Sequence, residues 1–201
     1  MIYSLRGKLI LKETELAVIE CAGVGYACRT TYSTLADLGE SGSEAFLYTY
    51  LHVREDNVEL FGFSTKQELN CFKMLLSVSG VGPKAALSVL SEVTSEKFAL
   101  LVAGDDSKAL TKVKGIGAKT AQRIVLELKD KIVKENGGIV AAAPRGTSND
   151  KNSDVSEAFS ALLVLGYTQS EIAPVLAKLD ETLPASELIR QALRALAKKL
   201  S

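Results

Sequence analysis

Two short glycine-containing segments have residue types and a spacing that suit the binding of phosphate groups. Residues 80–84 read Gly-Val-Gly-Pro-Lys, and residues 115–119 read Gly-Ile-Gly-Ala-Lys. The apolar positions on either side also coincide, so the second segment repeats the first 35 residues further along the chain. A repeat that preserves glycine, apolar and cationic positions indicates two copies of one structural unit.

Each copy is predicted to be a helix-hairpin-helix. In the first copy a helix ends near Val78, and the glycines then form a tight turn with backbone angles that a side chain would penalise. The helix that follows begins with unpaired amides, which together with its dipole attract a phosphate oxygen. Contact with phosphate and sugar predicts nucleic-acid binding that is largely blind to base sequence. The candidate binding residues are Gly80, Val81, Gly82 and Lys84 in the first copy, and Gly115, Ile116, Gly117, Lys119, Thr120 and Arg123 in the second.

The chain has no recognisable nucleotide-hydrolysis site. Residues 115–120 match a phosphate loop poorly, because Ala118 separates Gly117 from Lys119 and no strand is expected before them. Three cysteines without a C-x-x-C pair, and His52 as the single histidine, argue against a zinc site or a disulfide framework. We therefore predict no catalytic residue, no metal and no cofactor.

The elements that position these residues fall into successive stretches of the chain. Residues 1–63 contain about five short segments rich in β-branched and aromatic residues, which predict a small barrel such as the OB-fold. Residues 64–135 show a helix period, and we expect an N-cap at Ser64 with Gln67 completing a capping box. Residues 136–152 are rich in glycine, alanine and polar residues and are predicted to be a flexible linker. Residues 153–201 return to the helix period and fit three short helices.

The composition is that of an ordinary globular protein, with 201 residues of which 47% are hydrophobic and 24% charged. No apolar run approaches the roughly 18 residues of a membrane span, and the first residues lack signal-peptide features, so we expect a cytoplasmic protein. The net charge is zero but uneven. Residues 1–64 carry 5 Lys/Arg and 9 Asp/Glu, whereas residues 65–137 carry 12 and 8. The basic middle segment indicates a surface that faces a polyanion.

Further motifs make a family resemblance visible. They are residues 1–7 (MIYSLRG), 23–26 (GVGY), 53–56 (VRED), 60–63 (LFGF) and 161–167 (ALLVLGY), together with the two hairpins in this order. With them the chain resembles the RuvA family of Holliday-junction proteins over nearly its whole length. The resemblance implies a multidomain α+β fold with an OB-fold barrel, a tandem helix-hairpin-helix domain, a linker and a three-helix, UBA-like domain.

The resemblance also implies a function and partners. Family members bind four-way DNA junctions as homotetramers, or as octamers of two tetramers, and hold the junction open and flat. They recruit the hexameric ATPase RuvB for branch migration in recombination and DNA repair, and the resolvase RuvC shares the junction. The chain itself is then a non-catalytic, DNA-binding subunit of a helicase complex, with no membrane partner.

Residue roles follow from the same resemblance. It places Arg54 among the DNA-gripping cations and Glu55 and Asp56 on an acidic pin that keeps the crossing strands apart. From the residues alone, two adjacent carboxylates between strands are more typical of a solvated hairpin turn. The family pattern has a second cation where this chain has Ala118, a departure that concerns one phosphate contact and not the motif itself. The C-terminal residues implied in docking of RuvB are Leu162, Leu165, Tyr167, Leu193 and Leu196, although some of them must instead form the core of so small a module.

Two other functions compete with this interpretation. A DNA glycosylase or lyase can also carry a helix-hairpin-helix, but it needs an aromatic-lined pocket for an extruded base, and this chain has no Trp and 6% aromatic residues. A single-strand DNA- or RNA-binding OB protein uses a basic groove on its barrel, whereas this barrel segment is acidic. Preference for a four-way junction over linear or single-stranded DNA distinguishes the three functions.

Overall fold

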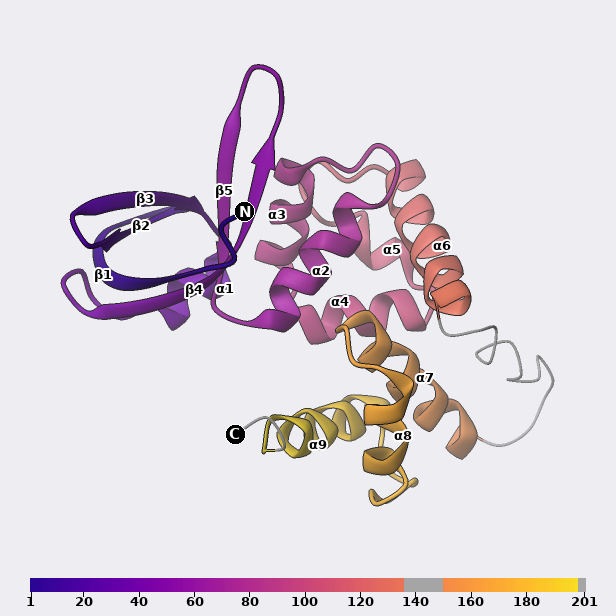
Figure 1. Cartoon of the computed structure of the whole chain (residues 1–201). Helices are drawn as coiled ribbons and strands as arrows, with labels where there is room; N and C mark the ends of the chain where they lie inside the picture. Colours follow the sequence, from indigo (N-terminus) through magenta and orange to yellow (C-terminus); the bar gives the residue numbers. More distant parts are fainter. Residues whose placement is uncertain (136–149, 199–201) are drawn as a thin grey trace.

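The computed structural model describes residues 1–135 and 150–198, which form a barrel, a helical domain and a C-terminal helical module (Figure 1). The predicted barrel is confirmed: five strands close in the order β1-β2-β3-β5-β4, and the parallel pairing of β3 with β5 completes the ring. Alternate residues such as Leu9, Ile19 and Leu47 point inward and are fully buried. The strands are β1 (Ser4–Glu13), β2 (Leu16–Cys21), β3 (Val24–Arg29), β4 (Glu44–Val53) and β5 (Val58–Phe63), with helix α1 (Tyr32–Asp37) between β3 and β4.

The helical domain contains both predicted hairpins. Its helices are α2 (Lys66–Leu76), α3 (Pro83–Glu92), α4 (Ser95–Ala103), α5 (Ser107–Leu110) and α6 (Ala118–Glu135). Helices α2 and α3 flank the first glycine turn, α5 and α6 flank the second, and α4 connects the two. Ala86 and Ala121, at equivalent positions of α3 and α6, are fully buried. Their small side chains let the paired helices approach closely.

The predicted cap of α2 is wrong by one residue. Thr65, not Ser64, is the N-cap, and its hydroxyl accepts a hydrogen bond from the amide of Glu68. Ser64 instead donates to Asp37 at 2.7 Å. Glu68 is 4% exposed, and its carboxylate accepts hydrogen bonds from three hydroxyls of the α1 segment, Thr31, Ser33 and Thr34. These bonds compensate the burial of a charge and fix the barrel against α2.

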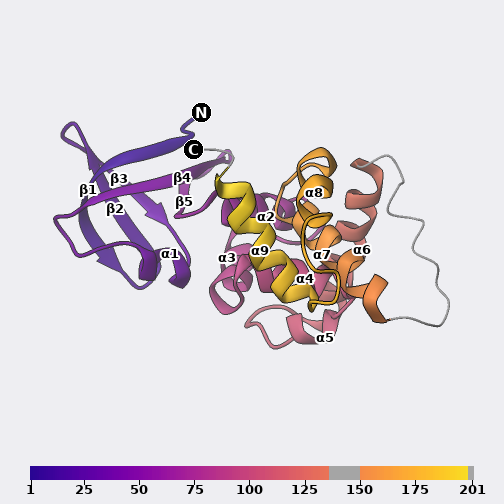
Figure 2. The ribbon, with the colours of Figure 1, turned by 90° about the horizontal axis from the view of Figure 1, so that it is seen from below.

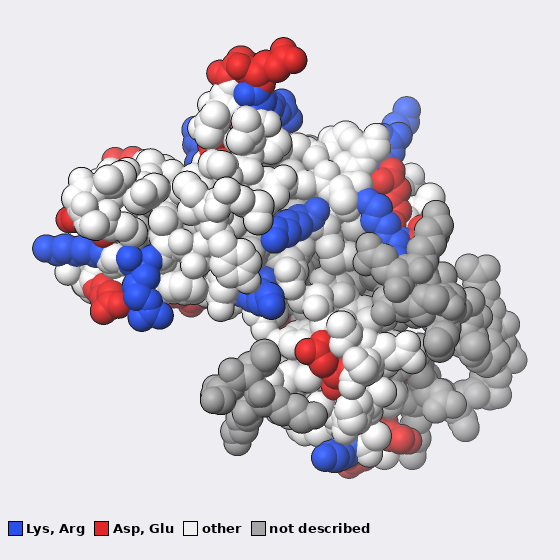
Figure 3. Space-filling model, in the orientation of Figure 1, with Lys and Arg blue, Asp and Glu red and all other residues white. Residues whose placement is uncertain are grey.

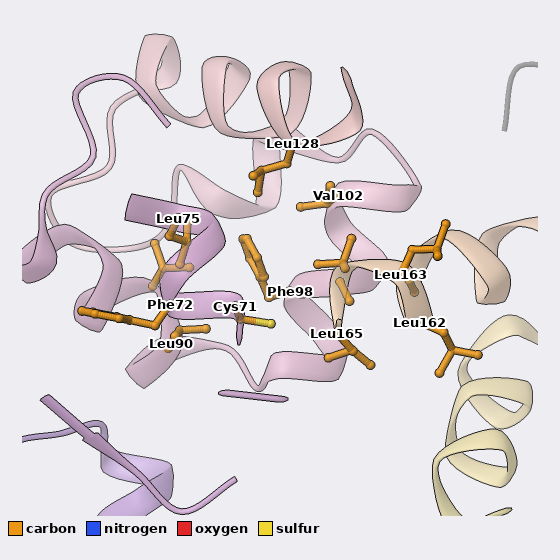
Figure 4. Packing of buried hydrophobic residues seen from close by; sticks show 14 of the residues in the cluster. Cys71, Phe72, Leu75, Leu90, Phe98, Val102, Leu128, Leu162, Leu163 and Leu165 are labelled. Carbon is orange, nitrogen blue, oxygen red and sulfur yellow. The ribbon is translucent and has the colours of Figure 1, made fainter. Parts of the chain in front are cut away.

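The C-terminal module consists of α7 (Asp150–Val164), α8 (Gln169–Leu176) and α9 (Ala185–Lys198), which agrees with the predicted three helices. Most of the predicted linker, residues 136–149, lies outside the described residues, and α7 begins within its last part, at Asp150. The module packs against α4 and α2 (Figures 1 and 2). Figure 4 shows that residues of α7 and of the helical domain, such as Leu163 and Phe98, belong to one continuous core. No helix within the described ranges combines the length and apolar character that a membrane span requires.

Candidate nucleic-acid interface

The two glycine turns have the same backbone geometry. Gly80 and Gly115, the first glycine of each turn, have φ angles of 83° and 87°, a left-handed conformation that side chains rarely adopt. The apolar residue that follows donates its amide back across the turn, from Val81 to Val78 and from Ile116 to Val113, at 3.1 Å in both copies. Val81 and Ile116 are 6% and 3% exposed, so they anchor the turns to the core and do not offer side chains to a ligand.

The second glycine of each turn has no such conformational reason to be glycine. Gly82 has a φ of −93°, which any residue adopts. A Cβ atom added to Gly82 or Gly117 would meet no protein atom within 4 Å. Their carbonyls accept the first helical hydrogen bonds of α3 and α6, from Ala86 at 3.0 Å and Ala121 at 2.9 Å. The missing side chains therefore serve close approach from outside the protein.

Amides and cations surround this open backbone. The amides of Lys84 and Ala85, and those of Ala118, Lys119 and Thr120, precede the first intrahelical hydrogen bonds and have no helical partner. The Lys84 and Lys119 side chains are exposed in the first turns of α3 and α6, whereas Thr120 is half-buried. Since a cation opposes the helix dipole at this end, an anionic ligand explains both lysines. Each turn thus combines the free helix amides and the cation that a phosphate-binding site needs.

Arg123 connects the two hairpins. It lies on α6, yet its guanidinium donates to the carbonyl of Ser79 in the first hairpin at 3.3 Å. One turn later, the Glu127 carboxylate accepts from the Ser79 amide at 3.2 Å, and Lys131 donates to the carbonyl of Ser77. Residues 123, 127 and 131 are four apart and share one face of α6. The second hairpin's long helix therefore holds the loop of the first.

The predicted acidic pin forms the tip of the β4–β5 hairpin. This hairpin projects from the barrel beside α3, and acidic side chains cover its end (Figures 1 and 3). The turn closes with a hydrogen bond of 2.8 Å from the Arg54 amide to the Asn57 carbonyl. Arg54, Glu55 and Asp56 are all exposed, as a pin that meets DNA requires.

A groove of about 330 Å³ separates the barrel hairpin from the first helix-hairpin-helix. It brings Arg54 together with Lys84 and the open backbone of Gly82. The sites on α6 are not part of its lining. The complete lining is His52, Arg54, Asp56, Asn57 and Glu59 from the barrel, and Gly82, Pro83 and Lys84 from the helical domain.

The C-terminal residues expected to dock RuvB are mostly inside the protein. Leu162, Leu165 and Leu196 are almost completely buried, and Tyr167 and Leu193 are half-buried. The Tyr167 hydroxyl accepts a hydrogen bond of 2.7 Å from Gln67 of α2, and burial raises the pKa of this phenol. In this arrangement the buried leucines stabilise the module and its contact with the helical domain, and Tyr167 and Leu193 are the ones accessible to a partner.

Three residues of this region have roles that their local sequence does not predict. Glu68 fixes the barrel, Gln67 contacts the C-terminal module, and His52 lines the groove beside Arg54. For His52 a signal was available, because residues 52 and 54 are two apart at the end of a strand, and alternate residues of extended chain lie on the same face. The partners of Glu68 and Gln67 are more than 30 residues away, and no local pattern indicates them.

Comparison with known proteins agrees with this architecture. Residues 1–62 match the model of the RuvA N-terminal domain, residues 72–130 that of a SAM-like helix-hairpin-helix tandem, and residues 153–197 that of the RuvA C-terminal domain. A protein of Acetivibrio thermocellus described as Holliday junction branch migration complex subunit RuvA is 48% identical over 197 residues, covering 96% of this chain and 98% of that protein. A protein of Thermoanaerobacter sp. with the same description is 47% identical, covering 98% of this chain and 100% of that protein. One of Ruminiclostridium cellulolyticum is 42% identical, covering 96% of this chain and 98% of that protein. The chain belongs to the RuvA family.

Proposed function

We propose that this protein is the DNA-binding subunit of a branch migration complex, which binds four-way junctions through their phosphates and without regard to base sequence. The observation that carries the proposal is the pair of glycine turns. Each presents unpaired amides, a lysine and a backbone free of side chains at the N-terminus of a helix. The curated relatives' shared description as a Holliday junction branch migration complex subunit supports the same function.

The direct test compares three DNA substrates at two salt concentrations. We expect tight binding of a four-way junction, and weaker binding of linear duplex and single strands. A steep salt dependence should accompany all binding, because phosphate contacts release counterions. Equal affinity for the junction and for linear duplex would refute junction recognition, and preference for single strands would favour the OB-type single-strand binder instead.

Fourfold assembly completes the proposed site. The barrel and its hairpin expose several large apolar side chains, including Ile10, Leu11, Val24, Val53 and Val58, and an assembly would cover some of this apolar surface. A homotetramer would place four acidic tips around one axis. Solution mass with and without a junction distinguishes the monomer, the tetramer and an octamer of two tetramers.

The acidic tip then selects the junction by charge. Glu55 and Asp56 would repel the phosphates of a duplex that lay across the axis, whereas the open centre of a junction accommodates them. The double substitution Glu55→Gln and Asp56→Asn should therefore strengthen duplex binding and leave folding unchanged, because both side chains are exposed. An unchanged ratio of junction to duplex affinity would refute this role.

The C-terminal module is the proposed contact for the RuvB ATPase, and RuvC would share the junction on the tetramer. Half-buried Leu193 is a suitable residue to test, because it can reach a partner without unfolding of the module. Leu193→Ser should reduce RuvB-driven branch migration and spare junction affinity.

The three cysteines are all free thiols, which supports a cytoplasmic, reducing location.

A further inference from the structure

We infer that His52 is a positioning residue for Arg54, and that it joins the barrel hairpin and the first helix-hairpin-helix into one composite phosphate site. The inference rests on the proposed function, since it concerns how the same DNA backbone is held. It adds a residue that neither the hairpin motif nor the basic character of the helical domain indicates.

The contact between the two side chains defines the geometry. Arg54 donates its Nε–H to Nε2 of His52 at 2.9 Å, so the imidazole acts as the hydrogen-bond acceptor. This bond uses the Nε–H of the guanidinium and leaves both Nη groups available. Two Nη groups form the planar fork that binds phosphate oxygens in pairs.

The carboxylates near Arg54 do not occupy that fork. Among the described residues, no carboxylate lies within ion-pair distance of Arg54, although Glu55 and Asp56 follow it directly in the chain. Glu59, which pairs with His52 across the β4–β5 ladder, is bound instead to Arg29 at 2.7 Å. The guanidinium therefore remains available to a ligand that enters the groove.

An aromatic cluster fixes the imidazole relative to the first hairpin. The His52 ring stacks on Tyr50 at 6.2 Å between centroids and meets Phe61 edge-on at 6.4 Å. Both of these rings contact Phe72 of α2, at 5.6 Å and 5.1 Å. Because α2 leads into the first glycine turn, the cluster sets the direction of Arg54 relative to the turn, through His52.

The groove shows what this alignment achieves. Arg54 enters from one wall, and the backbone of Gly82 with the Lys84 side chain forms the other. A phosphate group in the groove can accept from the Arg54 fork and from the amides at the start of α3 at the same time. Without His52, Arg54 would lose rotamer freedom on binding, which weakens the contact.

The test uses two substitutions in the full-length protein. His52→Phe keeps an aromatic ring against Tyr50 and Phe61 but cannot accept a hydrogen bond, whereas His52→Gln carries an acceptor that reaches the position of Nε2. We expect His52→Phe to weaken junction binding about two- to tenfold, the effect of one lost hydrogen bond, and His52→Gln to remain within about twofold of wild type. Equal weakening by both would overturn the inference.

Repeating both substitutions in an Arg54→Ala background isolates the pair. In that background His52→Phe should have no further effect on junction affinity. The inference would be overturned if His52→Phe lowered the affinity equally in both backgrounds. It would also be overturned if Arg54→Ala alone bound the junction with wild-type affinity. Equal thermal melting of all variants shows that folding is intact. The wild-type ratio of junction to duplex affinity tests the proposed function separately, and the coupling between the two residues can be measured on either DNA.

Discussion

Alanine substitution at the four glycines of the two turns should separate folding from DNA binding. The first glycines, Gly80 and Gly115, have φ angles of 83° and 87°. The second glycines, Gly82 and Gly117, have ordinary backbone angles and open space where a Cβ would lie. The same substitution should therefore lower the stability of the folded protein at the first pair of glycines and the affinity for DNA at the second pair.

The cost at the first pair is backbone strain. A non-glycine residue in the left-handed region costs about 1–2 kcal/mol, and no neighbour adds a clash, because the nearest atom to a Cβ at Gly80 would be Arg123 Nη1 at 3.6 Å. For a chain of this size, each kcal/mol lowers the melting temperature by about 2–4 °C. Gly80→Ala and Gly115→Ala should therefore melt about 2–8 °C below wild type.

At the second pair the protein loses almost nothing. Alanine is a slightly poorer N-cap than glycine, which destabilises the folded protein. Alanine also lowers the entropy of the unfolded chain, which stabilises the folded protein by a similar free energy. The free energy of unfolding should therefore change by less than about 0.5 kcal/mol. The added methyl group would lie where a phosphate approaches the amides. Loss of one charge-assisted hydrogen bond costs about 1.5–3 kcal/mol, which is about a 10- to 150-fold weaker affinity.

Melting curves and junction titrations of the four single variants test this separation. Gly82→Ala and Gly117→Ala should melt like wild type. Both should bind the junction at least about tenfold more weakly, because the loss of one charge-assisted hydrogen bond costs at least about 1.5 kcal/mol. If both bound the junction with wild-type affinity, the phosphate would not approach these glycines, and the reasoning about open backbone would be refuted. If these two variants were destabilised as much as Gly80→Ala, the claim that only the first glycine of each turn needs a left-handed backbone would be refuted.

Three further predictions concern charge, thiols and the C-terminal module. Lys84→Ala and Lys119→Ala should each lower the slope of log affinity against log salt by about 0.9 for each subunit in contact, as expected for one phosphate; an unchanged slope would contradict a direct contact. Burial raises the pKa of Cys28 to about 12 and that of Cys71 further. At pH 8 a thiol reagent should therefore label the native chain at one cysteine and the unfolded chain at all three. Fast labelling of all three cysteines in the native chain would contradict this prediction. Burial raises the pKa of Tyr167 in the folded protein, so its contribution to stability is complete below the unfolded value of 10 and is lost as pH rises further. Tyr167→Phe should lower stability by about 0.5–1.5 kcal/mol through its lost hydrogen bond and remove that alkaline decline, which unfolding curves at pH 8 and 11 would show.

The sequence predicts those features that depend on local periodicity. The barrel follows from alternation in short strands, and both hairpins follow from a repeat in which glycine, apolar and cationic positions coincide. The cap of α2 was displaced by one residue, because Ser64 and Thr65 are both good caps and the choice depends on Asp37, which takes the Ser64 hydroxyl from a distance of 27 residues.

Long-range packing is what the sequence does not reveal. Leu162 and Leu165 have the same apolar character whether they face a partner or the core, and only the packing of the C-terminal module within itself and against the helical domain shows that they are buried. The same holds for Arg123: its position on α6 indicates a phosphate ligand, whereas the structure also shows it bound to the first hairpin through Ser79. Side chains that connect distant segments carry no periodic signal.

The first hairpin is held from two sides, and this explains how phosphate contacts without base readout can select a DNA shape. On one side Glu68 and the aromatic cluster connect α2 to the barrel; on the other, Arg123 and Glu127 of α6 bind its loop at Ser79. These contacts would hold the two proposed phosphate sites and the acidic tip at set separations before DNA binds. A flexible set of the same cations would follow any duplex, whereas a rigid set binds well only to DNA whose phosphates already match its spacing. Selectivity for a junction thus depends on the residues behind the phosphate sites as much as on those that touch the DNA.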